Sequence, residues 1–254
     1  MVFKTLALAW PFQSPAIPIM IIFVPTPIGN LGDITLRALE TLRAADLIAC
    51  EDTRHSLKLL NHYEIAKTLV SLHEHNEEQR VAELLAKAAE GQKIAVISDA
   101  GTPCLSDPGY RLLCACVEND TSYEVLPGPS AITTALVASG FPPHPFAFRG
   151  FLAVKKGKRR HQLETALAAA ETTLFFESPH RLGSTLETIA ELDDIRQICV
   201  ARELTKKFET LHRGTASEIL AHFADRKVKG EIVLLIAPLV IEVKKEKRQK
   251  YPNP

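Results

Sequence analysis

The chain has 254 residues, of which 46% are hydrophobic and 24% are charged. This length and composition predict a globular protein with one large or two smaller domains, each with its own core. The 30 basic residues balance the 30 acidic residues, which argues against binding nucleic acid by bulk charge. The balance is uneven, because residues 1–127 hold 10 Lys and Arg against 16 Asp and Glu (−6), and residues 128–254 hold 20 against 14 (+6). A polyanionic partner would therefore bind the second half more readily.

The five cysteines are odd in number and form no CxxC pair. Four of them lie within apolar runs that are typical of strands or helices. This pattern favours buried free thiols in a reducing cytosol, and hence a cytoplasmic protein, over a disulfide framework or a metal site. No apolar stretch reaches the length of a membrane span. The cysteines are Cys50, Cys104, Cys114, Cys116 and Cys199.

Residues 1–20 contain one lysine, a short apolar stretch and then three prolines. A secretory signal is one interpretation, but no convincing small-residue cleavage site follows. We expect a dispensable N-terminal extension instead. Met20 stands directly before the first clear strand and is the expected initiator.

Short apolar runs alternate with amphipathic runs over residues 21–127, which we expect to form an N-terminal α/β domain. The expected strands are 21–25, 46–50, 68–72, 93–98 and 123–127, and the expected helices are 33–45, 55–63, 76–91 and 110–119. Asp33 and Asn76 are the expected N-caps of the first and third helices, and Gly91 the end of the third. This alternation predicts a mostly parallel sheet covered by helices.

The Pro/Gly-rich segment LPGPSA, residues 126–131, breaks this rhythm and marks the expected domain boundary. A C-terminal α/β domain is expected over residues 128–240, followed by a basic, disordered tail over 241–254. Its expected strands are 145–150, 172–178, 197–203, 208–214 and 231–237, and its expected helices lie at 130–140 and near 158–170, 180–192 and 215–224. Since no helix separates the third and fourth of these strands, the second sheet is predicted to be mixed.

The segment 97–109, ISDAGTPCLSDPG, follows an apolar strand and holds two turn clusters, each with an acid, a glycine and a proline. Ligands bind open α/β sheets at the carboxyl ends of strands, and this segment lies at such an end. Gly101 would let the backbone approach a ligand closely, and Pro103 and Pro108 would hold the loop rigid. Asp99 could accept hydrogen bonds from ribose hydroxyls or an amine. The alternative is a tight turn onto the next helix.

The loop after the first strand, VPTPIGNLGDIT, has the position of a dinucleotide-binding loop but not its spacing. Gly29 and Gly32 do not make GxGxxG, which disfavours a Rossmann pyrophosphate site and a nicotinamide-dependent dehydrogenase. Asp33 at the start of the following helix would also repel a phosphate.

Two other strand ends are polar. CEDTRHS, residues 50–56, brings an acidic pair next to Arg54 and His55, either as a structural salt-bridge network or as a functional loop. His73 and His75 share a strand face, so a metal is conceivable, but no third ligand is evident and we expect no metal site.

Basic residues gather in the second half. KKGKRRH, residues 155–161, holds five basic residues and follows the aromatic FRGF, and ARELTKKFE adds Arg202, Lys206 and Lys207. A solvated surface is the ordinary interpretation, and contact with a phosphate backbone is the alternative.

Five segments, in this order and spacing, resemble the ribosomal RNA small-subunit methyltransferase I family of tetrapyrrole-methylase-like enzymes. They are VPTPIGNLGDITLRALETLRAADLIACEDTR, ISDAGTPCLSDPG, LPGPSAITTAL, FFESPHRL and ARELTK. The resemblance covers about residues 21–238. Each motif alone would be weak, but the five together are highly specific.

The resemblance implies two α/β domains of the class III methyltransferase type with a cofactor cleft between them, usually in a homodimer. It implies S-adenosylmethionine as methyl donor. The implied acceptor is the ribose 2′-hydroxyl of a cytidine in the decoding region of 16S-type rRNA. The implied cofactor-binding residues are Asp99, Ala100, Gly101, Thr102, Pro103, Ser130, Ala131, Phe176, Gly230, Glu231 and Ile232.

Methyl transfer from a sulfonium is an in-line displacement, so much of its rate comes from alignment. A ribose hydroxyl is a poor nucleophile, and a nearby base should help to remove its proton. The candidate bases are Glu51, Asp52 and Glu177. The loop EDTR is favoured, with Arg54 holding a phosphate or orienting a carboxylate.

The 2′-hydroxyl target would itself select RNA over DNA, and the target base would have to leave its stack to reach a cleft. The expected contacts to the RNA backbone are Lys155, Lys156, Lys158, Arg159, Arg160 and Lys206. Family members often carry a further small helical region at the carboxyl end. Here a short basic tail stands in its place, so RNA affinity is expected to be weaker or to come from the basic runs.

Two rival functions remain open from the sequence. One is methylation of a tetrapyrrole or of a protein side chain on the same fold, against which the basic second half argues. The other is a non-catalytic RNA-binding module, which would have no need of the loop 97–109. Titration with the cofactor separates the second rival from an enzyme.

Overall fold

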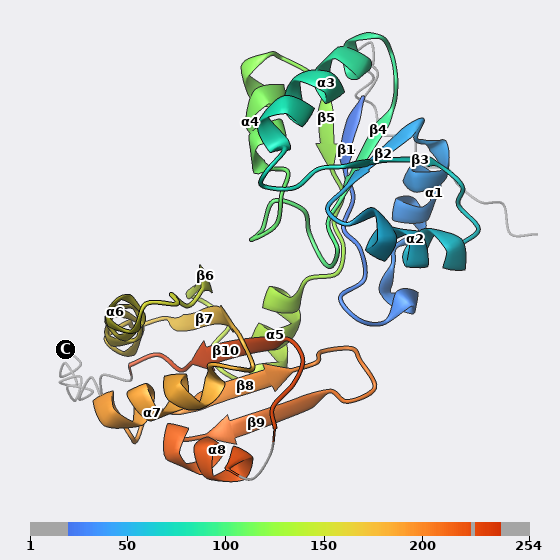
Figure 1. Ribbon diagram of the computed structural model, residues 1–254. Coiled ribbons are helices and arrows are strands. Elements are labelled where there is room, and N and C mark those ends of the chain that lie inside the picture. Colours follow the sequence, from blue (N-terminus) through green and yellow to red (C-terminus); the bar gives the residue numbers. More distant parts are fainter. Residues whose placement is uncertain (1–19, 225–226, 240–254) are drawn as a thin grey trace, which may run out of the picture. The chain divides into compact units, whose positions relative to one another are not determined.

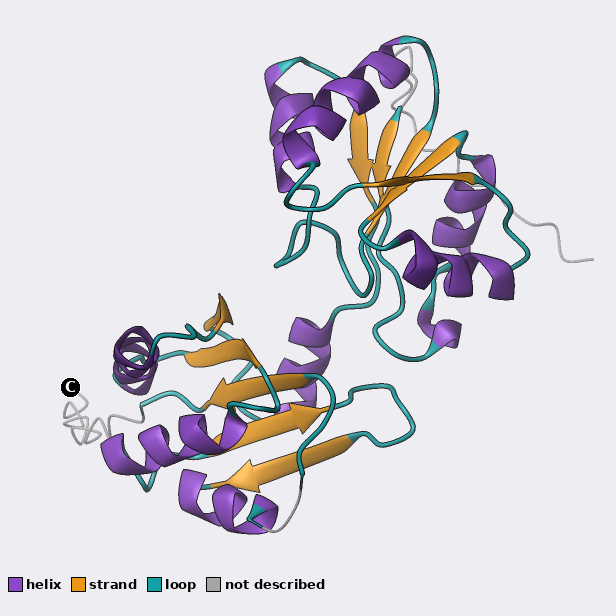
Figure 2. Cartoon of the chain, viewed as in Figure 1, coloured by secondary structure: helices purple, strands orange, loops and turns teal. Residues whose placement is uncertain are grey.

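The chain forms two compact units that divide between Ser130 and Ala131 (Figure 1). The computed structural model describes residues 20–224 and 227–239. The expected extension before Met20 and the expected basic tail lie outside the described residues. Each unit has its own sheet, helices and core (Figure 2). Over the described part of the chain, no helix combines the length and the apolar character needed to cross a membrane.

The first unit is built on a five-stranded sheet of order β3-β2-β4-β1-β5, in which every neighbouring pair is parallel. The predicted parallel sheet is thus confirmed. Its strands are β1 (Ile21–Phe23), β2 (Leu47–Cys50), β3 (Thr68–Ser71), β4 (Ile94–Ile97) and β5 (Tyr123–Val125). Its helices are the 3-10 turn η1 (Leu31–Asp33), α1 (Leu36–Ala44), α2 (Thr53–His62), α3 (Glu77–Ala89) and α4 (Tyr110–Glu118).

This sheet is apolar on both faces, as a parallel sheet between two helix layers must be. Along β4, Ile94 and Val96 belong to a core cluster with residues of α3 and α4. Their neighbours Ala95 and Ile97 point to the opposite face and pack with residues of α1 and α2. Figure 1 shows the two helix pairs on opposite sides of the sheet.

One predicted helix start is wrong. Asp33 ends the turn η1, and α1 begins three residues later with Thr35 as its N-cap. The Thr35 Oγ1 accepts the Ala38 N–H at 3.0 Å, which satisfies one of the unpaired amides of the first turn. Asn76 does stand at the N-cap of α3, but its Oδ1 accepts the His73 N–H at 2.9 Å instead of a helix amide. Gly91, which follows the C-cap of α3, has φ +90°, as is typical of a glycine that terminates a helix.

The second unit has a mixed sheet of order β6-β7-β10-β8-β9, in which only β6 and β7 are parallel. The prediction of a mixed sheet is therefore confirmed. Its strands are β6 (Phe146–Phe151), β7 (Thr172–Glu177), β8 (Ile198–Arg202), β9 (Thr210–Gly214) and β10 (Ile232–Ile236). Its helices are α5 (Ala131–Ser139), α6 (Lys156–Leu167), α7 (Leu182–Leu192) and α8 (Ala216–Phe223).

The core of the second unit lies between this sheet and three helices. Leu163 of α6, Leu186 of α7 and Ile219 of α8 pack with alternate residues of the central strands, such as Val200 and Leu234. Helix α5 contacts β8, β9 and β10 and covers the other face. The sheet is therefore fixed from both sides, which gives the loops at its ends a rigid base.

The loop between β4 and α4 is held by a buried carboxylate. Glu77, the first residue of α3, is 6% exposed. Its Oε1 accepts the N–H of Gly109 at 3.0 Å and of Arg111 at 3.2 Å. Within this loop Cys104 and Ser106 have positive φ, at 73° and 66°. Glu77 therefore caps the start of α4 and fixes the end of a strained loop.

We predict that Glu77→Ala lowers the free energy of unfolding by about 1–3 kcal/mol, because one buried and one partly buried amide lose their acceptor. Glu77→Gln should recover most of this loss, since the amide oxygen can accept both hydrogen bonds. Chemical denaturation monitored by circular dichroism measures the difference. The matched control is Glu78→Ala, at the exposed neighbouring position. An equal loss in both alanine variants would contradict the capping role.

Candidate active site

The carboxyl edge of the first sheet has the topology of a ligand site. Its strands are parallel, so the loops after β1, β2 and β4 leave at the same edge. From β1 the chain crosses to β2 on one side of the sheet, whereas from the adjacent strand β4 it crosses to β5 on the other side. This is the switch point at which open α/β sheets bind ligands.

The loops after β1 and β4 are joined by backbone pairing. The Thr26 N–H donates to the Gly101 carbonyl at 2.9 Å, and the Gly101 N–H donates to the Thr26 carbonyl at 3.0 Å. The hydroxyl of Thr26, a residue only 2% exposed, donates to the Ser98 carbonyl at 3.1 Å. Sequence reasoning missed Thr26, whose only signal is its place between two prolines in VPTPIG.

Glycine is required in this loop by conformation. Gly101 has φ +80°, where a residue with a Cβ would be strained, although the Cβ itself would make only ordinary contacts, with Ile28 at 3.4 Å and the Pro129 carbonyl at 3.8 Å. Its carbonyl also accepts the Ser98 hydroxyl at 3.3 Å, so both of its polar backbone groups are in use. The expectation that Gly101 grips a ligand with its backbone is therefore revised. Gly101 shapes the loop, and its neighbours are left to make contacts.

The loop after β5 packs closely against the loop after β1 at the same edge of the sheet. At Gly128 an added Cβ would lie 2.6 Å from the Cβ of Pro25, which is closer than real Cβ atoms come. The glycine in LPGPSA is thus explained by packing against the β1 loop.

An acidic cluster stands at the ends of β2 and β4. The Asp52 N–H donates to Asp99 Oδ1 at 3.2 Å, which ties the two loops together. Partial burial raises the pKa of the neighbouring Glu51, and repulsion from Asp99, Glu74 and Asp52 raises it further, while His73 acts in the opposite direction. Glu51 is thus the carboxylate of this edge whose ionised form is disfavoured.

Asp52 is held in a different state. It is the N-cap of α2, and its Oδ1 accepts the Arg54 N–H at 2.8 Å. The Arg54 guanidinium donates to both carboxylate oxygens, at 3.3 and 3.1 Å. Hydrogen bonds from Arg54 lower the pKa of the Asp52 carboxyl. Arg54 orients this carboxylate while its own side chain stays 89% exposed.

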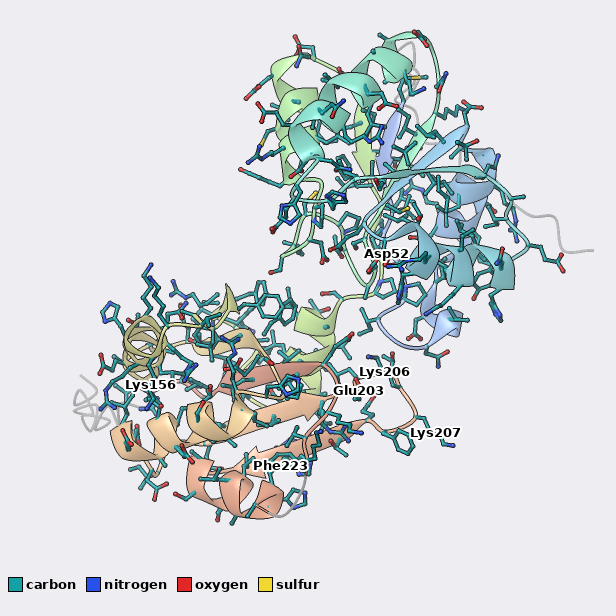
Figure 3. All side chains as sticks on the ribbon, in the orientation of Figure 1. Asp52, Lys156, Glu203, Lys206, Lys207 and Phe223 are labelled. Carbon is teal, nitrogen blue, oxygen red and sulfur yellow. The ribbon has the colours of Figure 1, made fainter. Side chains whose placement is uncertain are left out.

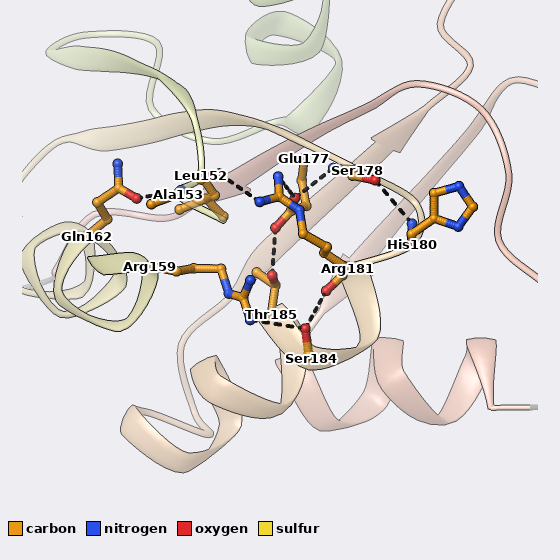
Figure 4. Close-up of polar contacts among 10 residues, drawn as sticks. All are labelled: Leu152, Ala153, Arg159, Gln162, Glu177, Ser178, His180, Arg181, Ser184 and Thr185. Carbon is orange, nitrogen blue, oxygen red and sulfur yellow. Dashed lines mark hydrogen bonds and ion pairs between the residues drawn. The ribbon is translucent and has the colours of Figure 1, made fainter. Parts of the chain in front are cut away.

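The third predicted base, Glu177 at the end of β7, is held in a network of ion pairs and hydrogen bonds within the second unit. Its carboxylate is buried and lies 2.7 Å from the Arg181 guanidinium. It also accepts the Thr185 hydroxyl and the Ser178 N–H, both at 2.6 Å. Figure 4 shows this network, in which Arg181 reaches on to the Leu152 carbonyl. Because this side chain is buried and both of its oxygens already accept hydrogen bonds or pair with protein groups, we withdraw Glu177 as a candidate base.

The other predicted cofactor residues lie at scattered positions. Ser130 ends the first unit and Ala131 begins α5. The ring of Phe176 stands 4.8 Å from that of Phe148 and 5.2 Å from that of Phe151, by their centroids. These three rings form an aromatic cluster on β6 and β7.

The last predicted segment lies at the start of β10. The Ile232 side chain is in the core cluster and 3% exposed, so only its backbone could meet a ligand. Gly230 has φ +94°, and a Cβ there would overlap the Glu203 carboxylate. Glu231 pairs with Lys206 at 3.1 Å.

The basic run on α6 divides into exposed and engaged residues. Arg159 is 5% exposed and donates to Ser184 at 3.2 Å, so it is wrong as an RNA contact. Arg160 bridges Glu164 and Glu191, at 3.2 and 2.8 Å. The exposed lysines are Lys155, Lys156 and Lys158.

His73 and His75 were the residues considered for a metal site. The rings of His73 and His75 have centroids 6.0 Å apart. Over residues 20–224 and 227–239, no group of three or more His, Cys, Asp or Glu side chains is arranged to hold a metal ion.

The sequence is similar to a described family and to several curated proteins. The model of the tetrapyrrole (corrin/porphyrin) methylases matches residues 20–220. A protein of Escherichia coli O157:H7 is 50% identical over 216 residues, which are 84% of this chain and 76% of that protein. One of Thermotoga maritima is 47% identical over 218 residues, which are 85% of this chain and 97% of that protein. Both are named ribosomal RNA small subunit methyltransferase I.

Solved structures of lower identity share the fold. The methyltransferase CobJ superposes with a TM-score of 0.65 at 21% identity, over 87% of this chain and 95% of that one. Uroporphyrin-III-C-methyltransferase from Thermus thermophilus gives 0.61 at 21%, over 86% and 94%.

These likenesses confirm the predicted fold class and the resemblance that the five motifs carried. The chain belongs to the tetrapyrrole (corrin/porphyrin) methylase family and, within it, to the group whose curated members are named ribosomal RNA small subunit methyltransferase I.

Proposed function

We propose that this protein is an S-adenosylmethionine-dependent methyltransferase that modifies the ribose 2′-hydroxyl of a cytidine in small-subunit, 16S-type ribosomal RNA. The observation that supports this most directly is the edge of the first sheet. There Glu51, with its raised pKa, stands beside a rigid loop that begins at Asp99. Relatives up to 50% identical, named for ribosomal RNA methylation, supply the substrate class.

The residues of this edge fit the cofactor. S-adenosylmethionine, when bound, supplies a methyl group on a positively charged sulfur. Asp99 Oδ1 accepts the Asp52 N–H. Among the described residues no donor reaches Asp99 Oδ2, which leaves that oxygen for ribose hydroxyls or an amine. We propose that Asp99, Ala100, Thr102 and Pro103 contact the cofactor, with Gly101 setting the shape of the loop. The roles of Ser130, Ala131, Phe176, Gly230, Glu231 and the Ile232 backbone stay predictions.

Glu51 is the base that we propose. A general base works best when its pKa lies near the working pH, and the pKa of Glu51 is raised in that direction. Hydrogen bonds from Arg54 lower the pKa of Asp52, away from the working pH. Arg54 holds Asp52 with Nε and Nη2, and its exposed side chain is placed to meet an RNA phosphate as well.

RNA is proposed to meet the exposed lysines of α6, where no carboxylate competes for Lys155, Lys156 or Lys158 within the described part of the chain. We further propose a homodimer in the cytoplasm, as the resemblance implies. Methylation of a tetrapyrrole or a protein side chain is the rival. The solved structures that share the fold include diphthine synthase, at 14% identity and a TM-score of 0.65, so the fold alone does not choose the substrate.

The first test is incubation with labelled S-adenosylmethionine and small ribosomal subunits that lack the modification, followed by nuclease mapping. We expect the label on a ribose hydroxyl of a single cytidine near the decoding site. Cofactor binding in calorimetry without labelled RNA would move the substrate to a tetrapyrrole or a protein. Absence of both would overturn the assignment of the loop 97–109.

We predict that Glu51→Gln lowers the rate of methyl transfer about 10²- to 10⁴-fold, because the base is lost. The rate of the unchanged enzyme should rise with pH through an inflection above 4.5, the ordinary value for glutamate, and the variant should lack that inflection. Single-turnover rates between pH 5 and 9 measure both.

The same variant has an opposite effect on stability. A carboxyl whose pKa is raised by folding favours the folded state at low pH and disfavours it once ionised. Glu51→Gln should therefore leave the melting temperature at pH 7 unchanged or higher, with the gain disappearing as the pH falls below 4.5. Glu78→Gln, at an exposed position outside the acids that raise the pKa of Glu51, is the control for activity. A rate for Glu51→Gln equal to that of the control would remove Glu51 as base.

We predict that replacing Lys155, Lys156 and Lys158 together by alanine weakens RNA binding and flattens its salt dependence. Each lost contact to a single-strand phosphate should reduce the slope of log K against log salt by about 0.7, or roughly 2 for three. Fluorescence anisotropy at several salt concentrations measures the slope. Lys93→Ala, an exposed lysine before β4, is the control. An unchanged slope would exclude this face of α6.

A further inference from the structure

The connection between β8 and β9, residues 203–209, is held by an arginine that is fully engaged. Arg202 ends β8 and donates through Nε to Thr210 Oγ1 at 3.1 Å, through Nη1 to the Lys229 carbonyl at 3.0 Å and through Nη2 to the Phe208 carbonyl at 2.9 Å. Its guanidinium therefore fixes both ends of the connection. This leaves it little capacity to bind a phosphate.

A second set of contacts fixes the start of the connection. Glu203 Oε1 accepts the Glu231 N–H at 3.0 Å and the Lys206 ammonium at 2.9 Å. Lys206 also pairs with the Glu231 carboxylate at 3.1 Å. Lys206 is thus neutralised by two carboxylates, and the expectation that it contacts RNA is revised.

The backbone of the connection is strained at two residues. Glu203 and Thr205 have φ of 53° and 65°, a conformation that residues with a side chain rarely adopt. The Thr205 N–H donates to Glu209 Oε2 at 2.6 Å, which closes the turn from within. Strain of this kind persists only where surrounding contacts enforce it, and it is common at binding sites.

This rigid turn displays two side chains to solvent. Phe208 is 66% exposed, although its carbonyl is fixed by Arg202. The exposed Lys207 places its ammonium 5.6 Å from the centroid of the Phe208 ring, within range of a cation–π attraction. Figure 3 shows Lys207 projecting from this connection, with Lys206 and Glu203 close to one another at its start.

We propose that Lys207 and Phe208 form a nucleotide-binding element, in which Phe208 stacks on an unpaired base of the RNA substrate and Lys207 contacts the neighbouring phosphate. The inference rests on the proposed function and deepens it. An aromatic ring beside a cation matches a base beside a phosphate in both shape and charge. A base must leave its helix to stack on such a ring, so the element selects single-stranded RNA and tolerates any base.

The test compares three substitutions at Phe208. Alanine should weaken binding of a single-stranded RNA oligonucleotide about 5- to 150-fold, the usual range for one stacked base. Leucine, which keeps apolar area but has no ring, should weaken it almost as much. Tryptophan should restore it. Duplex RNA of the same length should bind all the variants alike.

The tryptophan variant also gives a direct signal. The chain has a single tryptophan, Trp10, and in a Trp10→Phe background the new indole is the sole tryptophan reporter. Saturating single-stranded RNA should quench its emission by stacking, and duplex RNA should not.

Two matched controls separate this element from general surface effects. Tyr110→Ala removes an aromatic residue of similar exposure, 63%, on α4, and should leave RNA affinity unchanged. Lys207→Ala should reduce the salt slope by about 0.7, whereas Lys93→Ala should not. Melting temperatures establish that each variant is folded.

The outcomes distinguish this inference from the proposed function. If the unchanged protein methylates RNA and Phe208→Ala binds single-stranded RNA with unchanged affinity, the element is wrong and the function stands. If Phe208→Ala instead dissociates an oligomer in light scattering without changing RNA affinity, the surface is a contact between copies. If the unchanged protein binds the oligonucleotide through Phe208 but transfers no label to RNA, the element stands and the proposed reaction fails.

Discussion

The backbone pairing of Thr26 with Gly101 is the interaction on which the candidate active site depends. It joins two adjacent strand-end loops that then run in opposite directions over the sheet. The hydroxyl of Thr26 and the contact of Gly128 with Pro25 extend this joint to β4 and to the loop after β5. Since Thr26 is buried, breaking the joint would leave buried polar groups unpaired, which costs about 1–3 kcal/mol for each group. The position of Asp99 is therefore set by the backbone of three loops.

The three carboxylates predicted as candidate bases lie in different environments. Asp52 caps a helix and pairs with Arg54, which stabilises its ionised form. In the second unit, the buried carboxylate of Glu177 pairs with Arg181 and accepts the Thr185 hydroxyl. Partial burial and the neighbouring acids raise the pKa of Glu51, so its proton is held more tightly. An acceptor hydroxyl that must lose a proton is served best by the last of these environments.

Much of the fold followed from the sequence, because periodicity and breakers report local physics. The strands and helices of both units were expected within a few residues, and the mixed second sheet followed from two strands without a helix between them. Asp33 failed as a cap because Thr35, two residues on, is equally able to accept an amide hydrogen bond. The sequence could not separate Lys156, which is exposed, from Arg159, which turns inward to Ser184. Because basic residues occur on every side of this helix, the sequence pattern does not indicate which side is buried.

The site residues that sequence missed share one property, which is that their partners are distant along the chain. Glu77 contacts Gly109, 32 positions away, and Thr26 contacts Ser98, 72 positions away. No local pattern specifies such pairs. The family resemblance predicted that the loop 97–109 belongs to the site. It could not show that the Gly101 N–H and carbonyl are already hydrogen-bonded to the protein itself.

Backbone strain offers a last comparison between the two loops to which ligand roles are assigned. Six residues with a side chain have positive φ in the described part of the chain: Glu64, Cys104, Ser106, Asp120, Glu203 and Thr205. The first and fourth of these follow directly on the ends of α2 and α4, where a left-handed residue is an ordinary helix terminus. The other four lie in the connection after β4 and in the connection after β8. Each costs about 1–3 kcal/mol and persists only where neighbouring groups enforce it, and in both connections a charged side chain does so. Glu77 holds the first, and Arg202 holds the second. The strained shape of each connection is therefore maintained by the hydrogen bonds that its backbone makes with one of these two side chains.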